Sequence, residues 1–143
     1  MQKYLWVVAL VLSTQAASAE EGGWLALKAT QGEYRLSMNT QSIKREAEVV
    51  NVTFRYVYPE TQIFPFLNKK YDSTERLFYF QCAEHKMVAA QNDFFMGKAL
   101  VHSISAAASN PLAPNANQPQ PVPPNTPEEE AFNYACKFVP GKK

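Results

Sequence analysis

The residues of this chain whose types could support chemistry are few, and their spacing forms no familiar site. The two histidines, His85 and His102, lie far apart in sequence, and neither has a carboxylate or second ligand at metal-binding spacing. A zinc or iron site needs three or four such ligands. Ser103 and Ser105 follow His102, but no G-x-S-x-G nucleophile turn precedes them. The sequence therefore predicts no metal, no cofactor and no enzymatic activity. A small hydrolase is kept as an alternative, ranked after the two protein-binding functions described below.

The two cysteines, Cys82 and Cys136, are expected to form a structural disulfide bond rather than a reactive site. In an oxidising compartment an even number predicts a disulfide, and two cysteines allow one intramolecular pairing. Such a bridge would stabilise the fold by about 4 kcal/mol, because it constrains the unfolded chain. A reactive thiol or a metal ligand is the alternative, and it is disfavoured because neither cysteine lies in a C-x-x-C motif or beside a histidine.

The first residues predict the compartment in which this bridge forms. Residues 1–19 read MQKYLWVVALVLSTQAASA, with Lys3, then an apolar run, then the small-x-small triplet that ends at Ala19. This is the pattern of a secretory signal peptide cleaved after Ala19. The apolar run would span only about 14 Å as a helix, about half of a hydrocarbon core, which disfavours a membrane span. No cysteine lies near the cleavage point, so we expect no lipid anchor and a periplasmic or secreted protein.

Charge and composition limit the partners of the mature chain, residues 20–143, which we expect to form a single domain. Fourteen basic residues stand against thirteen acidic ones, and loss of Lys3 would leave thirteen of each. A balanced chain has no field to attract nucleic acid, and it has no polybasic run for anionic lipid. We therefore expect a protein partner and no nucleic acid.

Alternating apolar residues predict an antiparallel sheet of about six strands in series, a meander. The clearest strand runs from Glu48 to Tyr58 and ends at Pro59, and the stretch from Glu60 to Glu75 is expected to be a connection. Asn92-Asp93 is expected to be a turn, and Gly97 a bulge or bend within the last strand. The other expected strands are Trp24 to Thr30, Glu33 to Met38, Arg76 to Ala83, His85 to Gln91 and Phe94 to Ile104.

Residues 106–125 are rich in proline and predict an extended, solvated connection that makes no sheet ladder. A helix is expected over residues 127–138, because Thr126 is a good N-cap, Pro127 suits the first position and Glu129 completes a capping box. Phe132 and Cys136 share its apolar face. The predicted fold is thus α+β, with the disulfide tying the C-terminal helix to the sheet.

A recognition surface is predicted from aromatic residues in the expected connection. Phe64 and Phe66 flank Pro65, and Arg55 lies on the face of its strand opposite the apolar residues. Exposed rings give contact area at low entropy cost, so we expect Arg55, Phe64 and Phe66 to contribute to partner binding. The alternative is that Phe64 and Phe66 fold back under the connection as a small satellite core.

The order of these features resembles the surface-adhesin protein E family of proteobacteria. The resemblance rests on Trp24 in the first strand, on the segment YRLSMNTQSI over residues 34–43, and on Cys82 followed by Cys136 in a terminal helix. It implies a small curved sheet packed on a C-terminal helix, and a surface that binds proteins. The family's adhesins are associated with host matrix proteins such as vitronectin and laminin.

The chain departs from this family in two respects. The namesake adhesins are lipoproteins, whereas no lipobox cysteine is present here, and the proline-rich stretch is an addition. We therefore expect an adhesin-like, protein-binding envelope protein whose partner is a host matrix protein or an envelope protein. The alternative is a periplasmic accessory or inhibitor module that binds another envelope protein.

Overall fold

The computed structural model describes residues 22–28, 33–105 and 118–138. The expected signal peptide and its cleavage site lie outside these residues, as does most of the proline-rich stretch. In sequence order the helices and strands are β1 (Trp24–Ala26), β2 (Arg35–Asn39), the 3₁₀ helix η1 (Thr40–Ser42), β3 (Lys44–Glu46), β4 (Val49–Phe64), β5 (Lys69–Gln81), β6 (Lys86–Met96), β7 (Ala99–Ser105), β8 (Gln120–Pro121) and α1 (Pro127–Lys137).

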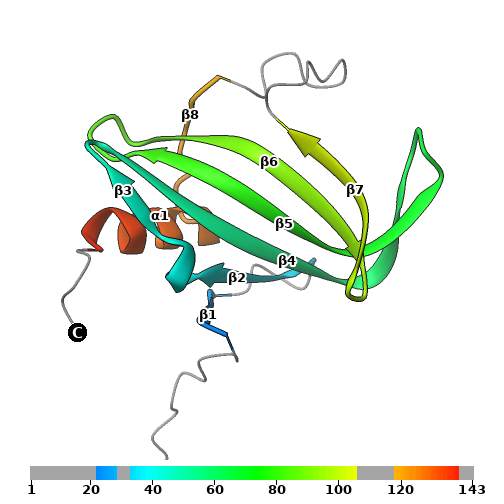
Figure 1. The fold of residues 1–143 in the computed structure, drawn as a ribbon. Helices are drawn as coiled ribbons and strands as arrows, with labels where there is room; N and C mark the ends of the chain where they lie inside the picture. Colours follow the sequence, from blue (N-terminus) through cyan, green and yellow to red (C-terminus); the bar gives the residue numbers. More distant parts are fainter. Residues whose placement is uncertain (1–21, 29–32, 106–117, 139–143) are drawn as a thin grey trace, which may run out of the picture.

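The strands form one antiparallel sheet in the order β1-β2-β4-β5-β6-β7, which confirms the predicted meander (Figure 1). The sheet has eight strands, and the two that the sequence did not predict are short: β3 pairs with β4, and β8 pairs with β6. The helix α1 lies against one face of the sheet at the end that carries β3, while the β4–β5 and β6–β7 hairpins extend at the other end (Figure 1).

Two local expectations were wrong. Pro59 does not end β4, which continues to Phe64, so most of the expected connection is a long hairpin. Pairing with β5 is interrupted between Val57 and Gln62, and Pro59 falls in this gap, where no ladder hydrogen bond to β5 is required of it. Asn92-Asp93 is not a turn but the middle of β6, and the turn into β7 lies at Gly97, whose φ of 59° suits glycine.

The core lies between the sheet and α1. One face of β4 carries Val50, Val52 and Phe54, each with 0% exposure, and we call this the core-side face. Phe80 on β5 shares it, and its ring meets Phe132 of α1 at a centroid distance of 5.3 Å. The opposite face, which carries Arg55, is called the outer face.

The C-terminal helix follows the predicted capping pattern. The side chain of Thr126 accepts a hydrogen bond from the Glu129 amide, and the Glu129 carboxylate accepts one from the Asn125 amide. Three glutamates in the first turn complement the positive end of the helix. A buried face of Ala131, Phe132 and Ala135 then packs on the sheet.

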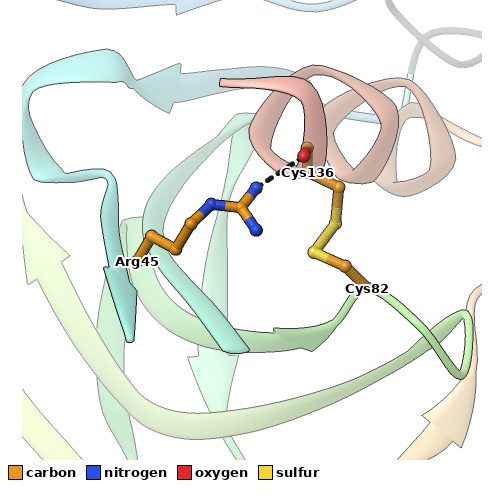
Figure 2. The surroundings of a disulfide bond; sticks show 3 residues. All are labelled: Arg45, Cys82 and Cys136. Carbon is orange, nitrogen blue, oxygen red and sulfur yellow. Dashed lines mark hydrogen bonds between the residues drawn. A yellow bond between two sulfur atoms is a disulfide. The ribbon is translucent and has the colours of Figure 1, made fainter. Parts of the chain in front are cut away.

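A disulfide joins Cys82, just after β5, to Cys136 in α1, with a Cα–Cα distance of 5.7 Å (Figure 2). Beside it, the Arg45 guanidinium donates a hydrogen bond to the Cys136 carbonyl oxygen (Figure 2). The predicted cross-link between helix and sheet is therefore confirmed, and β3 adds a second tie to the same turn of the helix.

The described end of the proline-rich stretch is not wholly solvated. Gln120 and Pro121 pair with Met87 and Lys86 of β6, which contradicts the expectation that the stretch makes no ladder. Val122 follows with 3% exposure, and its amide donates to the His85 carbonyl oxygen. This strand therefore places the start of α1 against the sheet.

Candidate functional site

Beyond the interruption in β4, residues 62–71 form a hairpin extension that we call the arm. The last paired residue before its turn is packed: the Phe64 ring lies 5.2 Å from the ring of Phe94 on β6 and 5.2 Å from that of His102 on β7. The Lys69 ammonium also donates to the Val101 carbonyl oxygen at 2.9 Å. The arm is therefore held against β6 and β7.

Large exposed apolar side chains gather at this end of the molecule. Among the described residues six such side chains are exposed, and five of them belong to the arm or to the β6–β7 hairpin. We call these five the open end: Ile63, Phe66, Leu67, Met96 and Leu100. Phe66 is 68% exposed and Leu100 is 58% exposed. The sixth, Tyr134, lies on α1.

Arg55 occupies the outer face, where two neighbours fix its guanidinium. Its Nε and Nη2 atoms donate to Glu75 Oε1 at 3.0 and 2.7 Å. The guanidinium carbon lies 3.9 Å from the centroid of the Trp24 ring, as expected for a cation–π contact. Trp24 itself is only 8% exposed.

A cavity of about 360 Å³ opens beside this ion pair. It is lined by Arg55, Ser73, Glu75, Phe95, Gly97 and Lys98. Three of these residues come from β4 and β5, and three from the end of β6 and the turn that follows it. The cavity therefore lies on the outer face next to the hairpin that carries Met96 and Leu100.

The structure does not bring the three predicted binding residues together. Arg55 lines the cavity on the outer face, whereas Phe64 packs against rings of the core-side face and Phe66 is exposed in the connection between β4 and β5. The sequence does not single out Lys98 and Leu100, because its pattern predicts the turn at Asn92-Asp93 rather than at Gly97. Gly97 was the available signal for their hairpin.

The two histidines serve packing rather than a shared site. The His85 ring lies 4.5 Å from Phe132 and its Nε2 atom 3.9 Å from a carboxylate oxygen of Glu129, whereas His102 packs against Phe64. Ser103 donates to Asp93 across the strand pair. Because successive strand residues point to opposite faces, His102 does not activate Ser103. In the described ranges no three His, Cys, Asp or Glu side chains group as metal ligands.

Two tyrosines on the core-side face have perturbed acidities. Burial raises the pKa of Tyr56 well above its ordinary value, and the negative charge of Glu128, which accepts a hydrogen bond from the Tyr56 hydroxyl at 3.1 Å, raises it further. Burial also raises the pKa of Tyr71, with a smaller contribution from Tyr58. Both hydroxyls therefore keep their protons at neutral pH.

Comparison with known proteins gives a consistent assignment. Over the part of the chain that the structure describes, no helix is long and apolar enough to cross a membrane. A search of curated protein sequences finds no significant match. Solved structures of Haemophilus influenzae protein E share the fold. One crystal form matches with a TM-score of 0.59 at 14% identity, covering 85% of this chain and 93% of that chain.

Two further structures agree. A second structure of Haemophilus influenzae protein E gives a TM-score of 0.58 at 14% identity, covering 85% of this chain and 89% of that one. Protein E from non-typeable Haemophilus influenzae gives 0.56 at 15% identity, covering 85% and 80%. The sequence itself matches the family described as surface-adhesin protein E over residues 24–137. From Trp24 of the first strand to Lys137 at the end of the disulfide-bound helix, the chain belongs to the surface-adhesin protein E family.

Proposed function

We propose that this is a non-enzymatic, adhesin-like protein of the bacterial envelope that binds a protein partner through its open end. The single observation that carries the proposal is the grouping of exposed apolar residues: Ile63, Phe66 and Leu67 on the arm, and Met96 and Leu100 on the adjoining hairpin. Exposed apolar side chains concentrated in one region are typical of an interaction site. Family membership supports protein binding as its purpose.

Within this site, Phe64 and Phe66 have different roles. Phe66 is the proposed contact residue, because its ring is 68% exposed and rigid aromatic side chains dominate binding energy in protein interfaces. Phe64 is the proposed support, because its contacts with Phe94 and His102 hold the arm in place. Arg55 is proposed to act from the neighbouring outer face.

The proposal is tested by capture of partners from two sources, bacterial envelope extract and host matrix proteins. Phe66→Ser should abolish capture of the partner while leaving the thermal midpoint unchanged, because an exposed ring contributes little to stability. Tyr134→Ser is the matched control, since Tyr134 is exposed on α1 at the other end. Equal capture by wild type and Phe66→Ser would overturn the assignment of the open end.

Location separates the adhesin from the accessory-module alternative. We propose that the signal peptide directs export and that the mature protein begins at Glu20. N-terminal sequencing of the exported form checks the cleavage site, and a different first residue would contradict it. Labelling of intact cells with an impermeant reagent should reach a surface adhesin and miss a periplasmic module.

A further inference from the structure

Three buried polar atoms without a hydrogen-bond partner lie together on the core-side face. In the described part of the chain, the buried side-chain atoms of this kind are Thr74 Oγ1, Arg76 Nε and Asn92 Oδ1. Thr74 and Arg76 are two residues apart on β5 and therefore share a face, and Arg76 pairs directly with Asn92 of β6. Buried polar atoms in native proteins are normally hydrogen-bonded, so a group of three unpaired ones points to a missing partner.

The Arg76 guanidinium supplies the positive charge of this cluster. Its central carbon lies 4.4 Å from the centroid of the Tyr56 ring, and among the described residues Arg76 has no ion pair. Glu128 supplies a negative charge at the same place, because it accepts a hydrogen bond from the Tyr56 hydroxyl. One positive and one negative group therefore face the cluster, and its net charge favours neither an anion nor a cation.

The other charged groups of these strands are engaged elsewhere. They are Glu75, which pairs with Arg55, Asp93, which accepts from Ser103, Asp72, which accepts from the Gly97 amide, and Lys69, which donates to the Val101 carbonyl oxygen. Glu75 and Asp93 point to the outer face, because each is next to a residue of the cluster in its strand. The balance between Arg76 and Glu128 is therefore not altered by them.

Four tyrosine rings border the cluster, and we call them the tyrosine row: Tyr34, Tyr56, Tyr58 and Tyr71. Neighbouring ring centroids in the row are 5.2, 6.4 and 5.7 Å apart, and Tyr71 continues to Phe94, the register partner of Thr74. Except for Tyr56 the rings are half-buried, and their hydroxyls have no partner among the described residues. Each offers an apolar ring together with a hydroxyl that both donates and accepts.

We infer that this part of the core-side face binds an N-acetylated amino sugar. The cluster presents one unpaired donor, Arg76 Nε, and one unpaired acceptor, Asn92 Oδ1, and an acetamido group offers one carbonyl acceptor and one N–H donor. The sugar ring beside it has C–H groups that pack on the tyrosine row and hydroxyls that bond to the phenol groups. Such a ligand is neutral, in keeping with the balanced charges.

The Arg76 side chain is the part that moves to admit this ligand. The three unpaired atoms are out of contact with water, so a ligand reaches them by displacing a side chain. Arg76 is flexible, and no ion pair holds it on the Tyr56 ring. A buried water would satisfy the same atoms without any ligand, and in that case no sugar binds. The site is separate from the open end and goes beyond the proposed function.

The experiment titrates the mature protein, labelled with ¹⁵N, with two trisaccharides that share the same backbone, triacetylchitotriose and cellotriose. Triacetylchitotriose should shift the amide resonances of Thr74 and Asn92. It should bind at least about tenfold more tightly than cellotriose, which lacks the acetamido group and leaves both atoms unpaired. Raising the salt concentration from about 0.05 to 0.5 M should leave its affinity unchanged, because the ligand is neutral. Equal affinity for the two sugars, or no binding, overturns the inference.

Side-chain variants test the named contacts. Asn92→Ala should lower the affinity for triacetylchitotriose about tenfold, and Asn51→Ala is the matched control, because Asn51 is half-buried on the outer face of β4. Tyr71→Phe keeps the ring packing, so it should leave the thermal midpoint unchanged and still lower the affinity about threefold. Unchanged affinity in both Asn92→Ala and Tyr71→Phe contradicts the inference.

Two further arms separate other ligands and other places. Acetyl-Gly-Gly-amide carries amide groups without a sugar ring, and binding as tight as that of triacetylchitotriose would make this face a peptide site instead. Phe66→Ser should bind the sugar as wild type does, and loss of sugar binding in this variant would place the site at the open end and overturn the inference. Failure of sugar binding together with loss of partner capture in Phe66→Ser leaves the proposed function standing.

Competition identifies the source of the sugar. Purified peptidoglycan sacculi and a host glycoprotein with terminal N-acetylglucosamine both carry the acetamido group. Displacement of triacetylchitotriose by sacculi would assign the bacterial wall, and displacement by the glycoprotein would assign the host surface. Displacement by neither polymer overturns the inference.

Discussion

The two ends of the sheet are built from similar side chains but differ in what covers them. At the helix end, Val50 and Phe80 are fully buried, and Phe132 of α1 packs on the Phe80 ring. At the open end, Phe66 and Leu100 are more than half exposed. Apolar residues of the same types therefore form core at one end and exposed surface at the other. The difference is that α1 covers the first end and no helix covers the second.

The two ends also differ in how they are fixed. The helix end is cross-linked by Cys82–Cys136 and by the Arg45 hydrogen bond to the Cys136 carbonyl oxygen. The open end is held by two hairpins that contact each other through ring packing and through Lys69. Stability should therefore be concentrated at the helix end and binding at the open end, which the following substitutions test.

The largest expected effect is at the covered end. Phe80→Ala should lower the free energy of unfolding by about 3–5 kcal/mol, because it leaves a cavity beneath the helix. Leu100→Ala at the open end should change it by less than about 0.5 kcal/mol. Denaturant titration measures both values, and similar losses in the two variants would remove the distinction between the ends.

Loss of the disulfide comes next. Cys136→Ser should lower the free energy of unfolding by about 2–5 kcal/mol, and Cys82→Ser should give the same loss, because both remove one cross-link. Reducing agent should destabilise wild type and leave both variants unaffected. If the purified protein reacts fully with a thiol reagent under denaturing, non-reducing conditions, the bridge is absent from the exported protein.

Tyr56 should make the covered end sensitive to alkaline pH. Its pKa in the folded protein is raised above the unfolded value of about 10. The stabilising contribution of Tyr56 to the free energy of unfolding is therefore fully present below about pH 10 and is lost as the pH rises further. Above about pH 10 this tyrosine should lower the free energy of unfolding by about 1.4 kcal/mol per pH unit.

Urea titrations at several pH values measure this slope. Tyr56→Phe should flatten the alkaline decline, because the variant has no hydroxyl proton to lose. Tyr134→Phe, which changes an exposed tyrosine on α1, is the control for general effects of high pH. An unchanged slope in Tyr56→Phe would refute the assignment.

The smallest contrast lies within the arm. Phe64→Ala should lower the free energy of unfolding by about 1–3 kcal/mol, because its half-buried ring packs on Phe94 and His102. Phe66→Ala should stay within about 0.5 kcal/mol of wild type. Thermal or denaturant unfolding distinguishes the two, and a larger loss in Phe66→Ala would reverse the proposed roles of the pair.

The sequence predicted the features that depend on local chemistry. Thr126, Pro127 and Glu129 define the start of α1 through contacts within one turn, and alternation along Val50, Val52 and Phe54 defines the core-side face. The disulfide followed from these two periodicities, because each placed one cysteine on an apolar face. The capping residues and the alternating apolar residues each lie within a few positions of one another, so a sequence alone reveals them.

Features that depend on distant partners were missed. β3 and β8 are three and two residues long, and their assignment depends on pairing with β4 and β6 rather than on their own composition. Pro59 ends a regular strand in isolation, yet here it falls where β4 and β5 are out of register. The outer-face cavity likewise joins residues of three strands and a turn, so no local pattern indicated it.

The position of α1 after all eight strands has a consequence for how the protein is made. A ribosome synthesises the chain from the N-terminus, so every strand exists before Phe132 and Cys136 are available to cover Phe80 and Val50. During this interval the core-side face is an apolar surface with no lid, and its hairpins can already pair, because they connect neighbours in sequence. Closure of this face therefore waits for the last helix of the fold, which carries both Phe132 and Cys136, and the apolar strands stay exposed until it is made.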